Sequence, residues 1–248
     1  MHLVKKLAIA LTVVLSSFLF VFATVKTSSG NNKVIIVSSP EISLTGASSD
    51  KVNSALFSQL HLGEAGMSPE AFNSALLGLE KLDAGGEIKH DNILTIIDFS
   101  QPSDKKRLYV LDLAHKRILF NTLVAHGINS GQLWAESFSN DPSSLKSSPG
   151  FYLTGETYRG DNGYSLRLDG LEKNINDNAR SRSIVMHGAS YVAQSAIGHL
   201  GFLGRSWGCP AVPLRFHRAI INTIKDGTCL FIYSPDKEYL EHSPILNS

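Results

Sequence analysis

Two residues in the C-terminal third of the chain carry the side chains that acyl transfer through a thiol requires. Cys209 lies in the run G-R-S-W-G-C-P-A at residues 204–211, and His187 follows the apolar run at residues 183–186. A cysteine is nucleophilic as the thiolate, and its ordinary pKa of roughly 8.5 keeps it mostly protonated at neutral pH. An imidazole, with an ordinary pKa of about 6.5, can accept that proton and later return it to a leaving amine. The sequence therefore predicts Cys209 as a nucleophile and His187 as its base.

The residues next to this pair predict how it is held. The run at residues 183–186 contains two β-branched side chains and predicts a buried strand that ends at Gly188. Gly208 permits a sharp turn, and Pro210 favours an extended backbone at the residue before it. We therefore expect the backbone amides of Gly208 and Cys209 to point at the oxyanion that develops during acyl transfer.

Residues 187–188 together with the run at 204–211 resemble the YkuD-type murein L,D-transpeptidases, in the branch that carries a GRSWGCPA signature. The resemblance covers most of the chain from about residue 93 to residue 233. It implies a mainly β fold with helices (α+β), a YkuD-like mixed β-sandwich with a helix after the cysteine. It also implies cysteine-dependent L,D-transpeptidase activity on peptidoglycan stem peptides, through a thioester at Cys209 formed with His187 as the base.

The sequence departs from the commoner motif of this family, which has S-H-G-C followed by an aliphatic residue and an arginine. Trp207 stands in place of that histidine, and Pro210 and Ala211 stand in place of the aliphatic residue and the arginine. The substrate contacts of the missing arginine must then come from another side chain. Arg205 is the nearest candidate because its forked guanidinium can bind a carboxylate, although it can also pair with an aspartate.

Four more residues are candidate substrate contacts, namely Ser206, Trp207, His126 and Tyr191. Trp207 can form an apolar wall for the substrate or simply pack within the protein. Ser206 can form a hydrogen bond within the turn or orient the base. His126 ends an apolar run, so it can line the cleft or be a hydrogen-bonded histidine at a strand end.

We expect no metal and no cofactor. His199 and His217 lie near Cys209 in the chain, but the sequence lacks the paired ligand spacing of a zinc site. A disulfide between Cys209 and Cys229 is the alternative for two cysteines in an exported chain. It is disfavoured because Cys229 lies in the apolar run T-C-L-F-I-Y, where a cysteine usually acts as a small buried hydrophobe.

The chain divides into four predicted parts. Residues 1–23 have a short basic region and an apolar core and predict a signal peptide, or a signal anchor if the segment is not cleaved. Residues 24–49 are rich in Ser, Thr, Asn and Gly and predict a linker. Residues 50–90 carry helical spacing, with Ser68 as an N-cap, and predict a short helical segment. Residues 91–248 are the predicted L,D-transpeptidase-like catalytic domain.

Alternating and apolar runs predict the elements of this domain. The predicted strands are residues 93–99, 107–113, 117–124, 151–155, 165–168 and 228–233, the last of which closes the sheet. Residues 125–150 predict a long loop that forms a binding wall. A helix is predicted from Pro213 to Lys225, just after the cysteine.

Composition and charge narrow the range of partners. Hydrophobic residues make up 43% and charged residues 18%, which is ordinary for a globular protein. The formal net charge is +1, and it becomes −1 once the predicted signal peptide with Lys5 and Lys6 is removed, so nothing favours nucleic-acid binding. We expect an exported monomer, in the periplasm or at the cell surface, with no membrane contact beyond an N-terminal anchor. Two alternatives stay open: an L,D-carboxypeptidase of the same fold, and a noncatalytic cell-wall-binding module.

Overall fold

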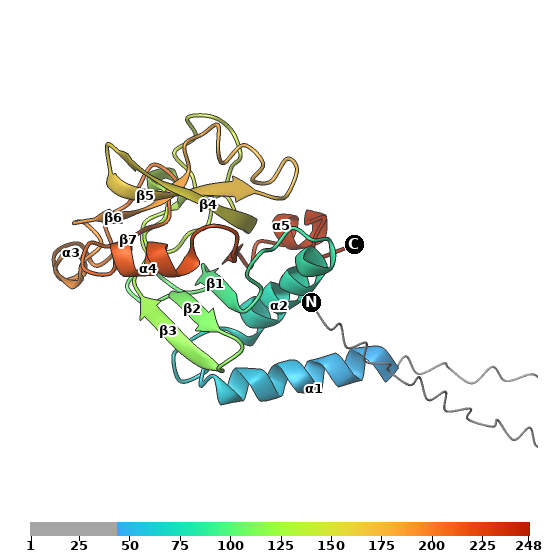
Figure 1. Cartoon of the computed structure of the whole chain (residues 1–248). Coiled ribbons are helices and arrows are strands. Elements are labelled where there is room, and N and C mark those ends of the chain that lie inside the picture. The colour runs from blue at the N-terminus through green and yellow to red at the C-terminus, as the bar shows by residue number, and fades with distance from the viewer. Residues whose placement is uncertain (1–43) are drawn as a thin grey trace, which may run out of the picture. The chain divides into compact units, whose positions relative to one another are not determined.

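The structure is a computed structural model that describes residues 44–248 (Figure 1). The predicted signal peptide and most of the predicted linker lie outside these described residues. The helices are α1 (Leu44–Gln59), α2 (Pro69–Ala84), α3 (Gln194–Leu200), α4 (His217–Ile224) and α5 (Lys237–His242), with a short 3-10 helix at Ile128–Ser130. The strands are β1 (Ile93–Asp98), β2 (Leu108–Asp112), β3 (Arg117–Thr122), β4 (Gly150–Gly160), β5 (Gly163–Gly170), β6 (Val185–Ala189), β7 (Ala211–Pro213) and β8 (Cys229–Tyr233).

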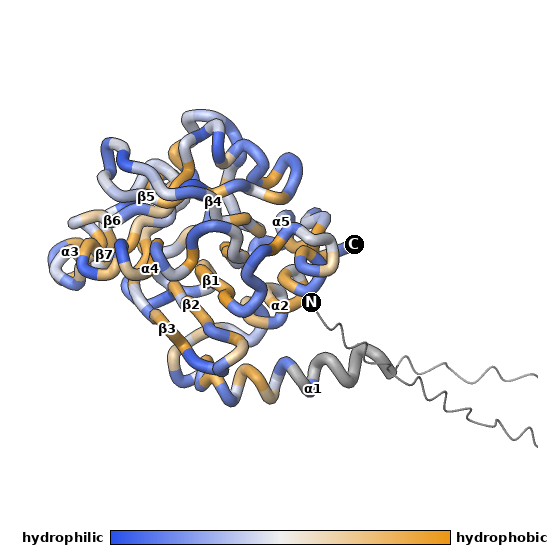
Figure 2. The backbone as a smooth tube through the Cα atoms, in the orientation of Figure 1, coloured by the Kyte–Doolittle hydropathy of each residue, from blue (hydrophilic) through white to orange (hydrophobic). Residues whose placement is uncertain are grey.

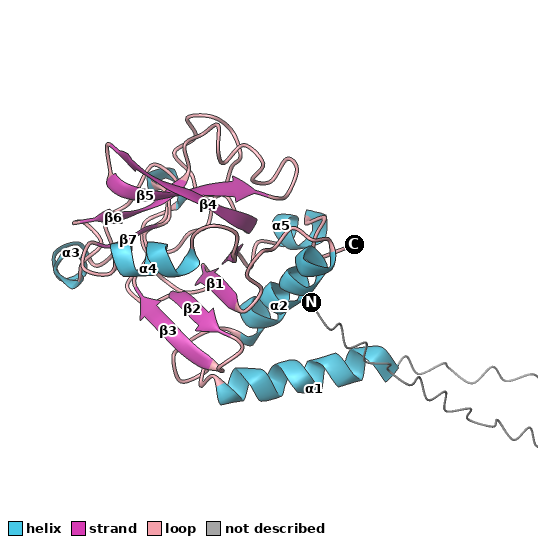
Figure 3. Ribbon diagram, viewed as in Figure 1, coloured by secondary structure: helices cyan, strands magenta, loops and turns pink. Residues whose placement is uncertain are grey.

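These strands form one mixed eight-stranded sheet in the order β3-β2-β1-β8-β4-β5-β6-β7. The pairs β1–β8 and β6–β7 are parallel, and the other pairs are antiparallel. The sheet curls on itself, because Ala125, which follows β3, bridges Ala211 in β7 at the far end of the strand order. Figure 3 shows β1 to β3 and β4 to β7 as two layers with α4 between them. The predicted mixed α+β fold with a helix after Cys209 is confirmed.

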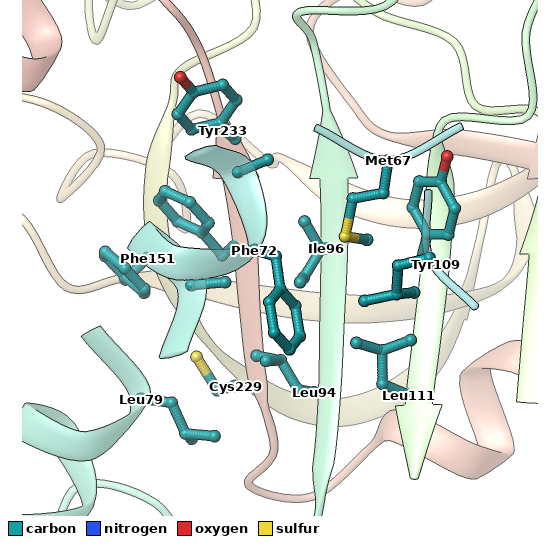
Figure 4. Close-up of a cluster of buried hydrophobic side chains, with 14 of the residues drawn as sticks. Met67, Phe72, Leu79, Leu94, Ile96, Tyr109, Leu111, Phe151, Cys229 and Tyr233 are labelled. Atoms are coloured by element: carbon teal, nitrogen blue, oxygen red, sulfur yellow. The ribbon is translucent and has the colours of Figure 1, made fainter. Parts of the chain in front are cut away.

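The central strands are apolar on both faces. In β8, Cys229 and Phe231 point into a core shared with α2, whereas Leu230 and Ile232 point into a core shared with α4. Figure 4 shows the first of these cores, and Figure 2 shows the hydrophobic character of β1 and β2. Successive side chains of a strand point to opposite faces, so a strand covered on both sides is apolar throughout rather than alternating. This explains the imperfect alternation of the predicted strands.

Helix α2 is attached to the sheet at its first turn. Ser68 is the N-cap, as predicted, and its hydroxyl accepts a hydrogen bond from the Ala71 amide at 3.0 Å. The Ser68 amide in turn donates to the buried carboxylate of Asp98, at the end of β1, at 3.0 Å. The helical segment is therefore part of the same core as the strands rather than a separate layer.

Some boundaries differ from those that the sequence predicts. The strand predicted at residues 228–233 forms, but β8 lies between β1 and β4 instead of closing the sheet. The helix predicted from Pro213 begins at His217, because Pro213 is the last residue of β7. Helix α1 already begins at Leu44, within the predicted linker. No helix among the described residues is long and apolar enough to cross a membrane.

The contact between α2 and β4 yields a prediction about stability. Gly78 of α2 faces the ring of Phe151, and a Cβ added there would lie 2.0 Å from Cζ of that ring, which itself stacks on Phe231. Alanine favours a helix over glycine by about 1 kcal/mol, but overpacking a core costs about 1–3 kcal/mol. We therefore expect Gly78→Ala to lower the free energy of unfolding, measured in urea, by up to about 2 kcal/mol.

Gly198 of α3 offers the matched control, because a Cβ added there would meet no atom within 4 Å. Gly198→Ala should leave the free energy of unfolding unchanged or raise it by up to about 1 kcal/mol. Equal effects of the two substitutions would contradict the close contact between α2 and β4.

Candidate active site

The pairing of β6 with β7 determines where Cys209 lies. The two strands run parallel with His187 opposite Ala211, so Cys209, two residues earlier, comes opposite Val185. The thiol is found at that point: the Val185 amide donates a hydrogen bond to Sγ at 3.4 Å, and Sγ lies 3.6 Å from the Ser183 carbonyl oxygen. The structure thus brings Cys209 and His187 to adjacent segments, two residues apart in register.

Ser206 and Gly208 fix the turn that carries Cys209. The Ser206 hydroxyl donates to the Cys209 carbonyl oxygen at 2.6 Å and accepts a hydrogen bond from the Gly208 amide at 3.1 Å. Gly208 has a φ of +120°, and a Cβ there would lie 2.6 Å from the Lys146 carbonyl oxygen, so the position requires glycine. Of the two roles considered for Ser206, the geometry fits the one within the turn. The Gly208 amide, expected to face an oxyanion, already has a partner in this structure.

The surroundings of Cys209 favour the protonated thiol. Burial raises the pKa of Cys209, whereas the hydrogen bond from the Val185 amide and the positive charge of Arg182 act to lower it. Burial has the larger effect, so the net pKa is above that of an ordinary cysteine. The thiol therefore needs a base before it can attack a carbonyl carbon.

His187 has the protonation state that a base requires. It is only 4% exposed, and burial lowers the pKa of its imidazole, with a smaller contribution from His217 in the same direction. The imidazole is therefore neutral at neutral pH. Its Nδ1 lies 3.1 Å from the Gly188 carbonyl oxygen, which accepts a hydrogen bond when Nδ1 is protonated. In that tautomer Nε2 is free to accept a proton.

Gly188 is needed next to this histidine because α4 approaches it closely. A Cβ on Gly188 would lie 2.7 Å from Cγ of His217, the first residue of α4. The helix after the cysteine thus packs directly behind the strand that carries His187.

Arg205 and Trp207 extend from the same turn in different ways. The Arg205 guanidinium donates to the carbonyl oxygens of Ile128 and Gly131, at 3.2 and 2.9 Å, and stacks near the ring of Phe202. It is therefore engaged with the neighbouring loop. The Trp207 side chain is 77% exposed, two residues from Cys209, so it is available to a substrate rather than packed in a core.

His126 belongs to a buried network. Its Nδ1 accepts a hydrogen bond from the guanidinium of Arg107 at 2.6 Å, and its Nε2 lies 3.2 Å from the Gly131 carbonyl oxygen. Burial and the charge of Arg107 lower the pKa of His126 to about 3, so the ring is neutral. With no exposed surface, His126 matches the alternative of a hydrogen-bonded histidine, although it lies four residues after the end of β3 rather than at a strand end.

Two further residues interact electrostatically with Cys209. Tyr191 is half-buried, and burial together with the negative charge of a Cys209 thiolate raises the pKa of its phenol to about 12. Arg182, whose positive charge lowers the pKa of Cys209, is not among the residues that the sequence singles out. Its only signal in the sequence is its place one residue before the predicted strand of His187.

The described residues contain no group of three or more His, Cys, Asp or Glu side chains arranged to hold a metal ion. Both cysteines are free thiols. Cys229 is fully buried in the core shared with α2, whereas Cys209 packs against the core shared with α4. The two thiols thus lie on different faces of the sheet, and this separation does not support the disulfide alternative.

The different burial of the two thiols predicts their reactivity. We expect one thiol of the folded protein to react with iodoacetamide, both to react after unfolding in urea, and Cys209→Ala to remove the reaction of the folded form. Because burial raises the pKa of Cys209, the alkylation rate should keep rising above about pH 8.5, where that of an ordinary cysteine begins to level off. Peptide mass spectrometry identifies the modified site, and modification of Cys229 in the folded protein would contradict this description.

Comparison with known proteins identifies the family. A sequence profile of the L,D-transpeptidase catalytic domain matches residues 63–233, well over half of the chain. No curated protein matches the sequence. Among solved structures, an L,D-transpeptidase from Mycobacterium smegmatis is 11% identical, with a TM-score of 0.36, over 58% of this chain and 59% of that chain.

Two other solved structures are similar to a comparable extent. An L,D-transpeptidase from Mycobacterium tuberculosis H37Rv is 15% identical, with a TM-score of 0.34, over 58% of each chain. The helical cell shape determining protein Pgp2 from Campylobacter jejuni is 16% identical, with a TM-score of 0.39, over 64% of this chain and 57% of that chain. The chain thus spans less than two thirds of the length of these solved chains.

These structural scores are low, so the assignment depends on the sequence profile. The matched residues include α2, every strand of the sheet, and both Cys209 and His187. The chain belongs to the L,D-transpeptidase catalytic domain family.

Proposed function

We propose that this protein is an exported, cysteine-dependent L,D-transpeptidase that acts on peptidoglycan stem peptides. The observation that carries the proposal is the parallel register of β6 and β7, which brings Cys209, two residues before β7, beside Val185 and two residues in register from His187. The family supports the substrate class, and a neutral imidazole on the strand next to the segment of a protonated thiol supports the chemistry.

In the proposed reaction, Cys209 Sγ attacks the carbonyl carbon of an L-residue that is bonded to a D-residue. Nε2 of His187 takes the thiol proton and gives it to the departing amine of the D-residue, which leaves a thioester on Cys209. The amine of a second stem peptide then attacks this thioester, and its proton passes through His187 back to the released sulfur. No net oxidation or reduction takes place.

The oxyanion of each tetrahedral intermediate needs hydrogen-bond donors. The Cys209 amide is the proposed donor that the turn leaves available. The Gly208 amide becomes a second donor if it gives up its hydrogen bond to the Ser206 hydroxyl. Trp207 and Tyr191 are the proposed substrate contacts, since both lie beside the thiol and keep exposed surface.

The site of action follows from the substrate. Peptidoglycan lies outside the cytoplasmic membrane, so we propose a location in the periplasm or at the cell surface, with residues 1–23 as a signal peptide or anchor and residues 24–43, the part of the predicted linker before α1, as a linker. The helical segment at 50–90 would then precede a catalytic domain at 91–248. Sequencing the N-terminus of the mature protein tests this division, and a start at Met1 would exclude cleavage.

Two alternatives each have an observation in their favour. An L,D-carboxypeptidase uses the same thioester but passes the acyl group to water, and Cys209 is partly accessible to solvent. A noncatalytic wall-binding module fits the fact that the Gly208 amide is already bonded within the turn. Binding alone does not require a histidine and a cysteine on adjacent segments, and the presence of both therefore favours an enzyme.

The proposal predicts a covalent acyl-enzyme. A carbapenem, which is a strained acyl donor, should add one equivalent of its mass to the protein, and Cys209→Ala should abolish the adduct. Cys229→Ala is the matched control and should keep it, because Cys229 is buried in the core behind α2. His187→Gln should slow acylation by roughly 10²- to 10⁴-fold, the usual range for loss of a general base. Intact-mass spectrometry measures all four proteins, and an adduct on Cys209→Ala would contradict the assignment of the nucleophile.

The acceptor of the acyl group, an amine or water, distinguishes an L,D-transpeptidase from an L,D-carboxypeptidase. With purified muropeptides, we expect cross-linked dimers and released D-alanine in equal amounts, because each transfer to an amine expels one D-residue. Liquid chromatography with mass spectrometry separates dimers from shortened stems. Shortened stems without dimers would establish the carboxypeptidase instead, and binding without either product would favour the wall-binding module.

A further inference from the structure

Arg182 lies at the end of the loop before β6, next to the residue whose carbonyl contacts the thiol. Its guanidinium donates four hydrogen bonds, all to the segment 139–148 and all to neutral oxygens. Nη1 donates to the Ser139 carbonyl oxygen at 2.8 Å and to Ser148 Oγ at 2.6 Å, and Nη2 donates to Ser144 Oγ at 3.1 Å and to the Lys146 carbonyl oxygen at 2.7 Å. One planar cation thus holds an irregular loop at four points.

The same loop supports the turn of the nucleophile. Ser147 Oγ donates to the Gly208 carbonyl oxygen at 3.1 Å and accepts a hydrogen bond from the Gly127 amide at 3.0 Å. The Lys146 carbonyl, which Arg182 binds, lies against the Cα of Gly208, so closely that a Cβ would not fit. Arg182 is therefore linked to the residue before Cys209 through a single intervening peptide segment.

Arg182 also acts on the thiol through its charge. Its acceptors are neutral, and the carboxylate of Asp141 acts on it only at longer range, so the positive charge is not cancelled by its hydrogen bonds. This charge opposes the effect of burial on the pKa of Cys209. The other groups around the thiol are the Val185 amide, the Ser183 carbonyl and the phenol of Tyr191.

We propose that Arg182 is a positioning residue for Cys209, which clamps the segment 139–148 beneath Gly208 and supplies a positive charge to the developing thiolate. The inference rests on the proposed role of Cys209 as the nucleophile. The role differs from the substrate contact predicted for Arg205, whose guanidinium is bonded to the loop carbonyls of Ile128 and Gly131.

The test compares Arg182→Gln and Arg182→Lys with Arg180→Gln as the matched control. Arg180 lies in the same loop but pairs with Glu156 and Asp169, away from the thiol. The rate of Cys209 alkylation by iodoacetamide is measured from pH 6 to pH 11, together with the Tm. A rise of one unit in the thiol pKa lowers the thiolate fraction about tenfold at neutral pH.

Arg182→Gln should move the inflection of the alkylation profile to higher pH and lower the rate at pH 7 by roughly 3- to 10-fold. Arg182→Lys keeps the positive charge but loses the forked guanidinium that forms the four hydrogen bonds. The inflection of its alkylation profile should therefore stay near that of the wild type, whereas its Tm should fall. Arg180→Gln should keep the wild-type profile. An unchanged profile in Arg182→Gln, or an equal shift in Arg180→Gln, would overturn the proposal.

A second variant covers the case in which Arg182→Gln does not fold. Ser147→Ala removes the hydroxyl that joins the loop to Gly208 but keeps the charge of Arg182. Ser147→Ala should slow acylation by the carbapenem without moving the inflection of the alkylation profile. If it is acylated as fast as the wild type, the proposed clamping of segment 139–148 is wrong. Alkylation of Cys209 does not require enzymatic turnover, so it tests the role of Arg182 independently of the proposed transpeptidase activity. A shifted profile in a protein that forms no acyl adduct would reject the enzyme and retain the action of Arg182 on the thiol.

Discussion

The parallel pairing of β6 with β7 sets the positions of Cys209 and His187. β7 has only three residues, so its own ladder is too short to fix its register. It is held from the other side as well: the Ala125 amide donates to the Ala211 carbonyl oxygen at 2.9 Å, and Ser206 exchanges backbone hydrogen bonds with His126 and Ile128. A slip of one residue would turn every side chain of the strand to the other face and remove Cys209 from its place beside Val185.

The segment that holds β7 depends in turn on a buried cation. Arg107 is fully buried, and although burial lowers its pKa to about 9 it remains charged at neutral pH. It donates to the carbonyl oxygens of Gln101 and Val124 and to Nδ1 of His126, and it lies over the ring of Phe99. A buried charge is tolerated only when its donors are satisfied, so this network tolerates few arrangements of the loop. The loop geometry behind the thiol is therefore set by electrostatics as much as by packing.

Patterns among neighbouring residues predicted most helices and strands, whereas contacts between residues far apart in the chain could not be predicted. The hairpin of β2 and β3, the cap at Ser68 and the strand of His187 all have patterns within a few neighbouring residues. β7 and α3 are too short to show a period. The role of Arg182 depends on acceptors 34 to 43 residues earlier in the chain, and that of Arg205 on carbonyls more than 70 residues earlier. The sequence around Arg182 does not distinguish it from a solvated surface charge, and the run that singles out Arg205 does not predict that its guanidinium binds backbone carbonyls.

Burial shifts the pKa values of Cys209 and His187 in opposite directions, and this affects when a proton could pass from the thiol to the imidazole. It raises the pKa of Cys209 and lowers that of His187, which widens the ordinary gap of about two units between thiol and imidazole. A difference of two pKa units corresponds to about 2.7 kcal/mol. Because burial widens this difference, moving the proton from Cys209 to His187 before a substrate is bound would cost more than that. In the proposed reaction the resting pair is therefore neutral, and the proton would leave as sulfur attacks the carbonyl carbon. Since oxidation also requires the thiolate, a resting thiol is better protected in an oxidising compartment. The Val185 amide and Arg182, which both lower the pKa of Cys209, would then stabilise the negative charge on sulfur as it forms in the proposed reaction.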